Sequence, residues 1–170
     1  LVGSEMCIRD RFYMKKEKYS FEFERFESKS ELAAEQKKVV EEAYDISLNA
    51  YAPYSNFNVG ASVQLENGEI FSSSNQENAS YPVGTCAERG LLAYVNANFP
   101  NIKIEKLAVS TPNVNYPLPP CGMCRQYILE IEKKQSQPIE IILSGKEGDV
   151  LVINSAKDLL PLHFTDEFLG

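Results

Sequence analysis

Two short sequence words combine thiols with a carboxylate, a set of groups suited to metal chemistry. The first word is Cys86-Ala87-Glu88-Arg89 and the second is Cys121-Gly122-Met123-Cys124. Three thiolates suit a Zn²⁺ ion, and a catalytic zinc site keeps the fourth of its tetrahedral positions open for water. Glu88 stands two residues from a cysteine, close enough to exchange protons with that water. The two words therefore predict a catalytic zinc centre that performs a hydrolysis.

Both words are predicted to begin helices, over residues 86–98 and 121–134. The free backbone amides and the positive dipole end of a helix favour a thiolate at its N-terminus. Cys121 and Cys124 are separated by two residues, so at a helix start they can face one ion together. We therefore expect two helix N-termini to converge on the metal.

Three thiolates around a divalent cation leave one net negative charge, which weakens the acidification of water and calls for compensation. Arg89 follows Cys86 by nearly one helical turn and is a candidate to hydrogen-bond its sulfur. Arg125 is a second candidate, although its position next to Cys124 does not fix its orientation. We expect Arg89 to serve as the outer-shell partner of the sulfurs.

The remaining pattern predicts an α/β fold in which helices cover both faces of one sheet. Ser30 is the expected N-cap of a helix over residues 30–50, and a short helix is expected over 156–160. Strands are expected over 59–65, from 70, and over 107–110, 139–143 and 150–153, with a turn at Asn67-Gly68. This predicts a three-layer α/β/α domain with a mixed five-stranded sheet. Alternation of Tyr19, Phe21 and Phe23 predicts either an extra N-terminal edge strand or an ordered arm.

The N-terminal residues differ from the rest of the chain and are treated separately. Residues 1–11 resemble the translation of a transposon adapter used in sequencing libraries, so we expect residues 1–13 to be non-native and Met14 to be the natural start. Residues 14–29 then form an N-terminal arm, and residues 30–170 form one domain.

The composition limits the kinds of molecule that the protein is expected to bind. With 17 basic and 24 acidic side chains the net charge is -7, which disfavours a nucleic-acid partner and favours a small neutral ligand. We find no run of about 18 apolar residues that could span a membrane. Once Cys7 is set aside with the adapter-like segment, three cysteines remain and nothing directs export, so we expect a reducing, cytoplasmic location.

A ligand-x-Glu word followed by Pro-Cys-x-x-Cys is the known signature of zinc-dependent deaminases. From about residue 50 to residue 162 the sequence resembles the small homotetrameric cytidine deaminases of the three-cysteine type. The resemblance implies hydrolysis of cytidine and deoxycytidine to uridine and deoxyuridine with release of ammonia, in pyrimidine salvage. It also implies one Zn²⁺ per subunit on Cys86, Cys121 and Cys124, with Glu88 moving the protons.

Further words extend this resemblance to substrate binding. It implies that Phe57 packs near the base and that Asn75 and Glu77 hold the ribose hydroxyls. It also implies that Ala79 and Tyr81 contact the substrate of a neighbouring subunit, and that Phe164 reaches into an adjacent site. Positions 75, 77, 79 and 81 are two apart, which places them on one side of an extended chain.

Other functions remain open at this point. A blasticidin-type antibiotic deaminase shares the metal words but lacks the Asn-x-Glu-Asn word found at residues 75–78. A non-catalytic zinc-stabilised binding module needs a fourth protein ligand, and the single histidine, His163, lies far along the chain. A thiol–disulfide role for residues 121–124 leaves Cys86 and Glu88 unexplained. A deaminase acting on polymers is disfavoured by the acidic charge.

Overall fold

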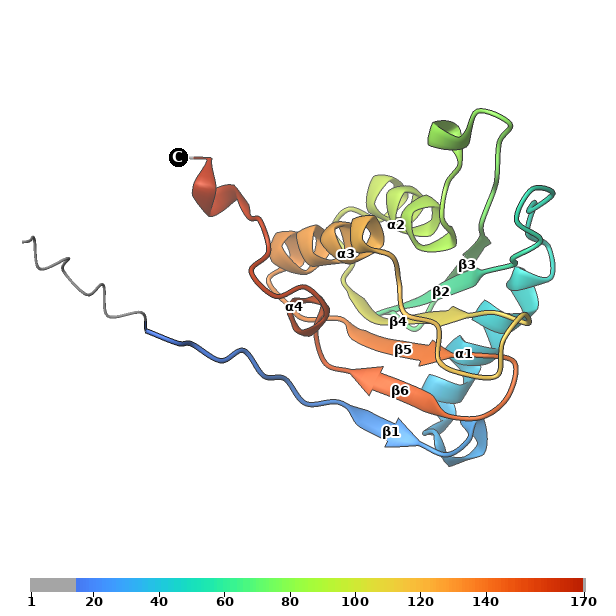
Figure 1. Ribbon diagram of the computed structural model, residues 1–170, viewed down its shortest axis with the longest axis horizontal. Coiled ribbons are helices and arrows are strands. Elements are labelled where there is room, and N and C mark those ends of the chain that lie inside the picture. The colour runs from blue at the N-terminus through green and yellow to red at the C-terminus, as the bar shows by residue number, and fades with distance from the viewer. Residues whose placement is uncertain (1–14, 170) are drawn as a thin grey trace, which may run out of the picture.

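A mixed sheet runs through the centre of the fold (Figure 1). The computed structural model describes residues 15–169, so the interpretation of residues 1–13 as non-native falls outside the described part of the chain. The sheet has the strand order β1-β6-β5-β4-β2-β3, in which β4 and β5 are parallel and the other neighbours are antiparallel. The strands are β1 (Glu24–Phe26), β2 (Gly60–Leu65), β3 (Ile70–Ser74), β4 (Ile104–Ser110), β5 (Glu140–Ser144) and β6 (Val150–Ile153).

Helices cover both faces of this sheet (Figure 1). On one face α1 (Ala34–Ser47) packs against alternate strand residues such as Ala108 and Ile142. On the other face α2 (Ala87–Asn98), α3 (Gly122–Gln135) and α4 (Ala156–Leu159) pack against residues such as Leu107. Because successive strand residues point to opposite faces, the continuous apolar runs of β4 and β5 fill both cores. Short 3₁₀ helices lie at η1 (Lys29–Glu31), η2 (Tyr81–Val83) and η3 (Asp166–Phe168).

The three-layer architecture is confirmed, with two corrections at the N-terminus. The sheet has six strands where the core pattern predicted five, because the chain adds the edge strand β1. That strand pairs with β6 and begins at Glu24, while the alternating Tyr19, Phe21 and Phe23 precede it as an extended, exposed arm. The predicted cap at Ser30 is also wrong. Helix α1 is capped at Ala33, whose amide donates to Gln36 Oε1 over 3.1 Å, and Ser30 lies in η1.

The sheet brings the two motif-bearing connections to one edge. The last residues of β3 and β4, Ser74 and Ser110, both pair with Gly60 at the start of β2. The chain therefore leaves the sheet at the same level on either side of Gly60, once towards α2 and once towards α3. Since each helix begins with a cysteine word, this register places the words close together.

Among residues 15–169, none of the helices combines the length and the apolarity that crossing a lipid bilayer requires.

Candidate metal centre and active site

Three cysteine sulfurs meet where α2 and α3 begin. Cys86 is the N-cap of α2, Cys121 is the N-cap of α3, and Cys124 lies in the first turn of α3. Their Sγ atoms all lie within 4.8 Å of one another, and the Cys121 and Cys124 sulfurs are 3.4 Å apart. Tetrahedral sulfurs at about 2.3 Å from zinc are separated by about 3.8 Å, so this donor set fits a Zn²⁺ ion.

The sulfurs are electrostatically prepared for a cation. A hydrogen bond with Cys124, aided by Arg89, lowers the pKa of Cys86 to about 5 in spite of partial burial. The same bond and burial raise the pKa of Cys124, so this thiol loses its proton less readily than Cys86 does. A metal ion must displace that proton, because only the thiolate ligates.

The structure distinguishes the two arginines. Arg89 Nη2 lies 3.9 Å from Cys86 Sγ and donates to the Gly84 carbonyl over 3.3 Å. The hydrogen bond to Cys86 raises the pKa of the Arg89 guanidinium further above its usual value. Arg125 instead donates to backbone carbonyls, through Nε to Pro120 and through Nη1 to Leu159. Arg89 is therefore the arginine that adjoins a sulfur.

Glu88 is a buried carboxyl beside the cysteines. It lies in the first turn of α2 and only 4% of its surface is exposed. Burial raises the pKa of Glu88, and the neighbouring Cys86 charge acts in the same direction. A carboxyl whose pKa is raised holds a proton more readily than an ordinary glutamate, which suits a group that must both accept and release one.

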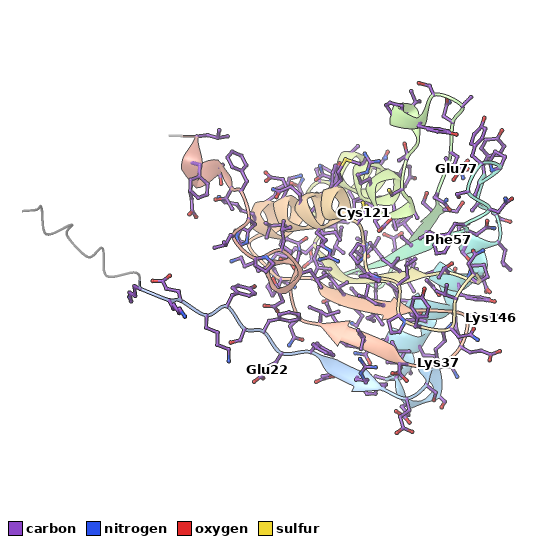
Figure 2. All side chains as sticks on the ribbon, in the orientation of Figure 1. Glu22, Lys37, Phe57, Glu77, Cys121 and Lys146 are labelled. Atoms are coloured by element: carbon purple, nitrogen blue, oxygen red, sulfur yellow. The ribbon has the colours of Figure 1, made fainter. Side chains whose placement is uncertain are left out.

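A cavity of about 330 Å³ opens beside the cysteines and brings several predicted residues together. Figure 2 shows Phe57 on the side of the molecule where α3 begins at Cys121. Five lining residues were not predicted from the sequence, although Ala87 lies within the first cysteine word and Leu118 and Pro119 directly precede Pro120; they are Ser55, Val59, Ala87, Leu118 and Pro119. The cavity is lined by Ser55, Phe57, Val59, Asn75, Cys86, Ala87, Glu88, Leu118, Pro119 and Cys121.

Asn75 borders this cavity and also holds one of its walls. Its Oδ1 accepts from the Val59 amide over 2.7 Å, and its Nδ2 donates to the Phe57 carbonyl over 3.0 Å. The amide side chain thus holds the backbone on both sides of residue 58, including that of Phe57.

Glu77 lies in an adjoining cavity of about 330 Å³, which shares Ser55 with the first. Its Oε1 accepts from the Ser55 hydroxyl over 2.5 Å, and its Oε2 accepts from the Tyr54 amide over 2.9 Å. The Ser55 hydroxyl, followed by the Tyr54 amide, lowers the pKa of Glu77. Asn75 and Glu77 therefore border neighbouring parts of one concave surface. Because its pKa is lowered, Glu77 stays ionised at lower pH than an ordinary glutamate does.

Three predicted substrate contacts do not line the cavity beside the cysteines, although Tyr81 lines the adjoining cavity that holds Glu77. Ala79 and Tyr81 are exposed, and Tyr81 begins η2 with its ring 5.8 Å from that of Tyr54. Phe164 is also exposed and stacks on Phe168 at 5.7 Å, on a different part of the surface. The role expected for these residues involves a neighbouring subunit and remains a prediction.

The chain is similar to known proteins over most of its length. The sequence profile of the cytidine and deoxycytidylate deaminase zinc-binding region matches residues 33–137. A cytidine deaminase from Halalkalibacterium halodurans is 35% identical over 131 residues, which cover 76% of this chain and 93% of that protein. One from Sporosarcina psychrophila is 37% identical over 133 residues, 78% of this chain and 93% of its own. The crystal structure of a Burkholderia pseudomallei cytidine deaminase superposes with a TM-score of 0.66 at 38% identity, covering 75% of this chain and 97% of that one.

Proposed function

The chain belongs to the cytidine and deoxycytidylate deaminase zinc-binding family, and on that premise we propose that it hydrolyses the exocyclic amine of cytidine and deoxycytidine. The products are uridine or deoxyuridine and ammonia. The observation that carries the proposal is the meeting of three cysteine sulfurs with the buried Glu88 at one cavity.

Each group of the site has a role in this reaction. When bound, zinc supplies a water molecule acidified enough to act as the nucleophile near neutral pH. Cys86, Cys121 and Cys124 hold the ion, and Arg89 offsets part of their charge. Glu88 accepts the proton that the nucleophile loses and delivers protons to N3 of the ring and to the departing amine. Phe57 packs against the base, which orients the carbon that is attacked.

The cavities favour a nucleoside over its 5′-phosphate. Neither cavity has a lysine or an arginine among the described residues that line it, and Glu77 adds a negative charge to the second. A phosphate entering there would lose its water without gaining a cationic partner. Asn75 and Glu77 instead offer oxygen atoms to sugar hydroxyls, so they select for ribose or deoxyribose as well as binding it.

We further propose that the protein works as a homotetramer with shared active sites, in the pyrimidine salvage of a reducing cytoplasm. The exposed Ala79, Tyr81 and Phe164 support the sharing, because they are free to contact a second copy. Cys86, Cys121 and Cys124 form no disulfide, which suits a reducing compartment.

One assay tests the reaction and its substrate together. Zinc content is measured on the same preparation as ammonia release from cytidine, deoxycytidine, cytidine 5′-monophosphate and blasticidin. We expect about one zinc per chain and rapid release from the two nucleosides only. Turnover of blasticidin without cytidine turnover would replace the proposal with an antibiotic deaminase, and a zinc-loaded protein inactive on all four would point to a binding module.

A further inference from the structure

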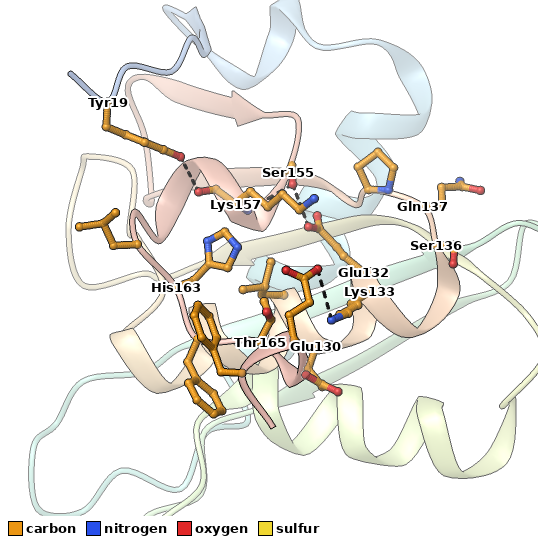
Figure 3. A pocket seen from close by; sticks show the side chains of 16 residues that line it. Tyr19, Glu130, Glu132, Lys133, Ser136, Gln137, Ser155, Lys157, His163 and Thr165 are labelled. Atoms are coloured by element: carbon orange, nitrogen blue, oxygen red, sulfur yellow. Dashed lines mark hydrogen bonds and ion pairs between the residues drawn. The ribbon is translucent and has the colours of Figure 1, made fainter. Parts of the chain in front are cut away.

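Helix α3 begins at the zinc ligands and also carries the C-terminal segment, residues 155–169, along its length. Near its end, Glu132 accepts from the Ser155 hydroxyl over 2.8 Å, and Lys133 forms an ion pair with Asp166. Figure 3 shows Glu132 and Lys133 beside Ser155 and the rest of this segment. These two contacts lie about two helical turns beyond the cysteines, so they hold the segment without touching the ligands.

The contacts near the start of α3 are different because they reach both features. Arg125 Nε donates to the Pro120 carbonyl over 2.8 Å, and Arg125 Nη1 donates to the Leu159 carbonyl over 2.9 Å. Pro120 precedes Cys121 directly, and Arg125 follows Cys124 directly. One guanidinium therefore bonds both to the turn that carries Cys121 and Cys124 and to the C-terminal segment at Leu159.

Gln126, the next residue of α3, also bonds to the C-terminal segment. Gln126 Nε2 donates to the Phe164 carbonyl over 3.0 Å, so residues 159–164 are held at both ends by neighbouring side chains of α3. Unlike Arg125, Gln126 has no contact with the Pro120 carbonyl among its described hydrogen bonds. The chain thus offers variants that separate the two connections.

We propose that Arg125 is a positioning residue that couples the Cys121–Cys124 ligand turn to the placement of residues 159–164. A planar guanidinium with two donors in fixed relation holds the two carbonyls in one geometry, which a flexible ammonium does not. The coupling rests on the zinc centre of the proposed function and does not require that the reaction be deamination. By reciprocity, zinc binding tightens the segment to the extent that segment docking tightens zinc.

The first experiment measures the segment directly. Chymotrypsin cleavage after Leu162, which is 98% exposed, is followed by mass spectrometry in zinc-loaded and chelator-stripped protein. In the wild type, stripping zinc should speed cleavage by about fivefold or more, the lower end of typical coupling between sites. In Arg125→Lys the cleavage should be fast already and change by less than about twofold on stripping.

Lys133→Ala is the matched control, because it loosens the same segment far from the ligands. Its cleavage should be faster than in the wild type but still respond to zinc by about fivefold. A second readout is the rate at which zinc passes to a chromogenic chelator. That rate should rise for Arg125→Lys by about tenfold, the lower end of outer-shell effects on metal affinity, and stay unchanged for Gln126→Ala and Lys133→Ala.

Three results would overturn the coupling. They are cleavage of the wild type that ignores zinc, an Arg125→Lys protein that responds to zinc as the wild type does, and loss of the overall circular dichroism spectrum in Arg125→Lys. The last would make Arg125 a general support of the fold. None of these readouts uses deaminase activity, so failure of the proposed reaction would be seen separately in the ammonia assay.

Discussion

The metal-binding and nucleoside-binding parts of the candidate site are built in contrasting ways. The cysteine sulfurs and Glu88 come from two helix starts and converge within one chain. The predicted nucleoside contacts diverge: Asn75 and Glu77 hold loop backbone beside the cavities, while Phe164 faces outward elsewhere. Reactive groups are thus fixed by rigid local structure, whereas recognition depends on extended segments and, in our proposal, on other copies of the chain.

Removing the metal should have the largest effect on activity, because it disables the metal-binding part of the site. Chelation under reducing conditions is expected to abolish ammonia release, since Glu88 without the ion has no acidified water to deprotonate. Activity should return on addition of zinc, measured against metal content by atomic absorption. Full activity in metal-free protein would remove the basis for assigning the cysteines to catalysis.

Glu88→Gln tests the role of the carboxylate in the metal-binding part of the site while the ion stays in place. An amide keeps the shape of the side chain but cannot accept a proton, so kcat should fall by about 10²- to 10⁴-fold. Zinc content should stay at the wild-type value. Near-normal turnover in this variant would rule out Glu88 as the proton carrier.

Phe164→Ala tests whether recognition is shared between chains. Stacking of an aromatic ring on a base contributes about 1–3 kcal/mol, so kcat/KM should fall by about 5- to 150-fold. Mixing this protein with Glu88→Gln should create sites that pair an intact Glu88 with an intact Phe164, and activity should exceed the sum of the two preparations. Activity that is strictly additive after subunit exchange would count against shared sites.

Glu77→Gln should have a smaller effect that falls mainly on KM. A hydrogen bond to a charged group contributes about 1.5 kcal/mol or more, so loss of the carboxylate should raise KM by about tenfold. Steady-state assays should show little change in kcat. Glu69→Gln, in the exposed turn between β2 and β3, is the matched control and should behave as the wild type.

Ser55→Ala should produce the smallest change, visible in the pH dependence. The Ser55 hydroxyl is the main cause of the lowered pKa of Glu77, so its removal moves that pKa upward. A lowered pKa keeps the carboxylate ionised at lower pH, and KM in the wild type should therefore begin to rise only below the ordinary range of a glutamate. In Ser55→Ala the rise in KM should begin at higher pH; identical profiles would contradict this role of Ser55.

Local sequence signals predicted the convergent part of the site well. Cysteines at helix starts and a carboxylate two residues away are short-range features, and the structure places all of them where the spacing indicated. The cavity beside the cysteines, by contrast, depends on Ser55 and Leu118 meeting across more than sixty intervening positions. No local pattern in either segment predicts that meeting.

The predictions at the N-terminus were limited by the same cause. Alternating aromatic residues predicted either an edge strand or an ordered arm, and the edge strand is present, but at residues 24–26, because that is where β6 offers Val150–Val152 as a partner. Ser30 had the residue type of a cap, but Gln36 supplies the reciprocal bond to Ala33 instead. The role of Arg125 was likewise hidden, because its second carbonyl belongs to Leu159 and is brought close only by folding.

The parallel pairing of β4 and β5 has a consequence for how this scaffold can change. Parallel neighbours cannot be joined by a tight turn, so the chain must cross over the sheet, and α3 is that crossover. The connection ahead of it, residues 111–120, supplies Leu118 and Pro119 to the cavity wall but no ligand and no strand. Substitutions at Leu118 and Pro119 can therefore reshape the wall of the substrate cavity while the metal ligands, Glu88 and the sheet stay as they are.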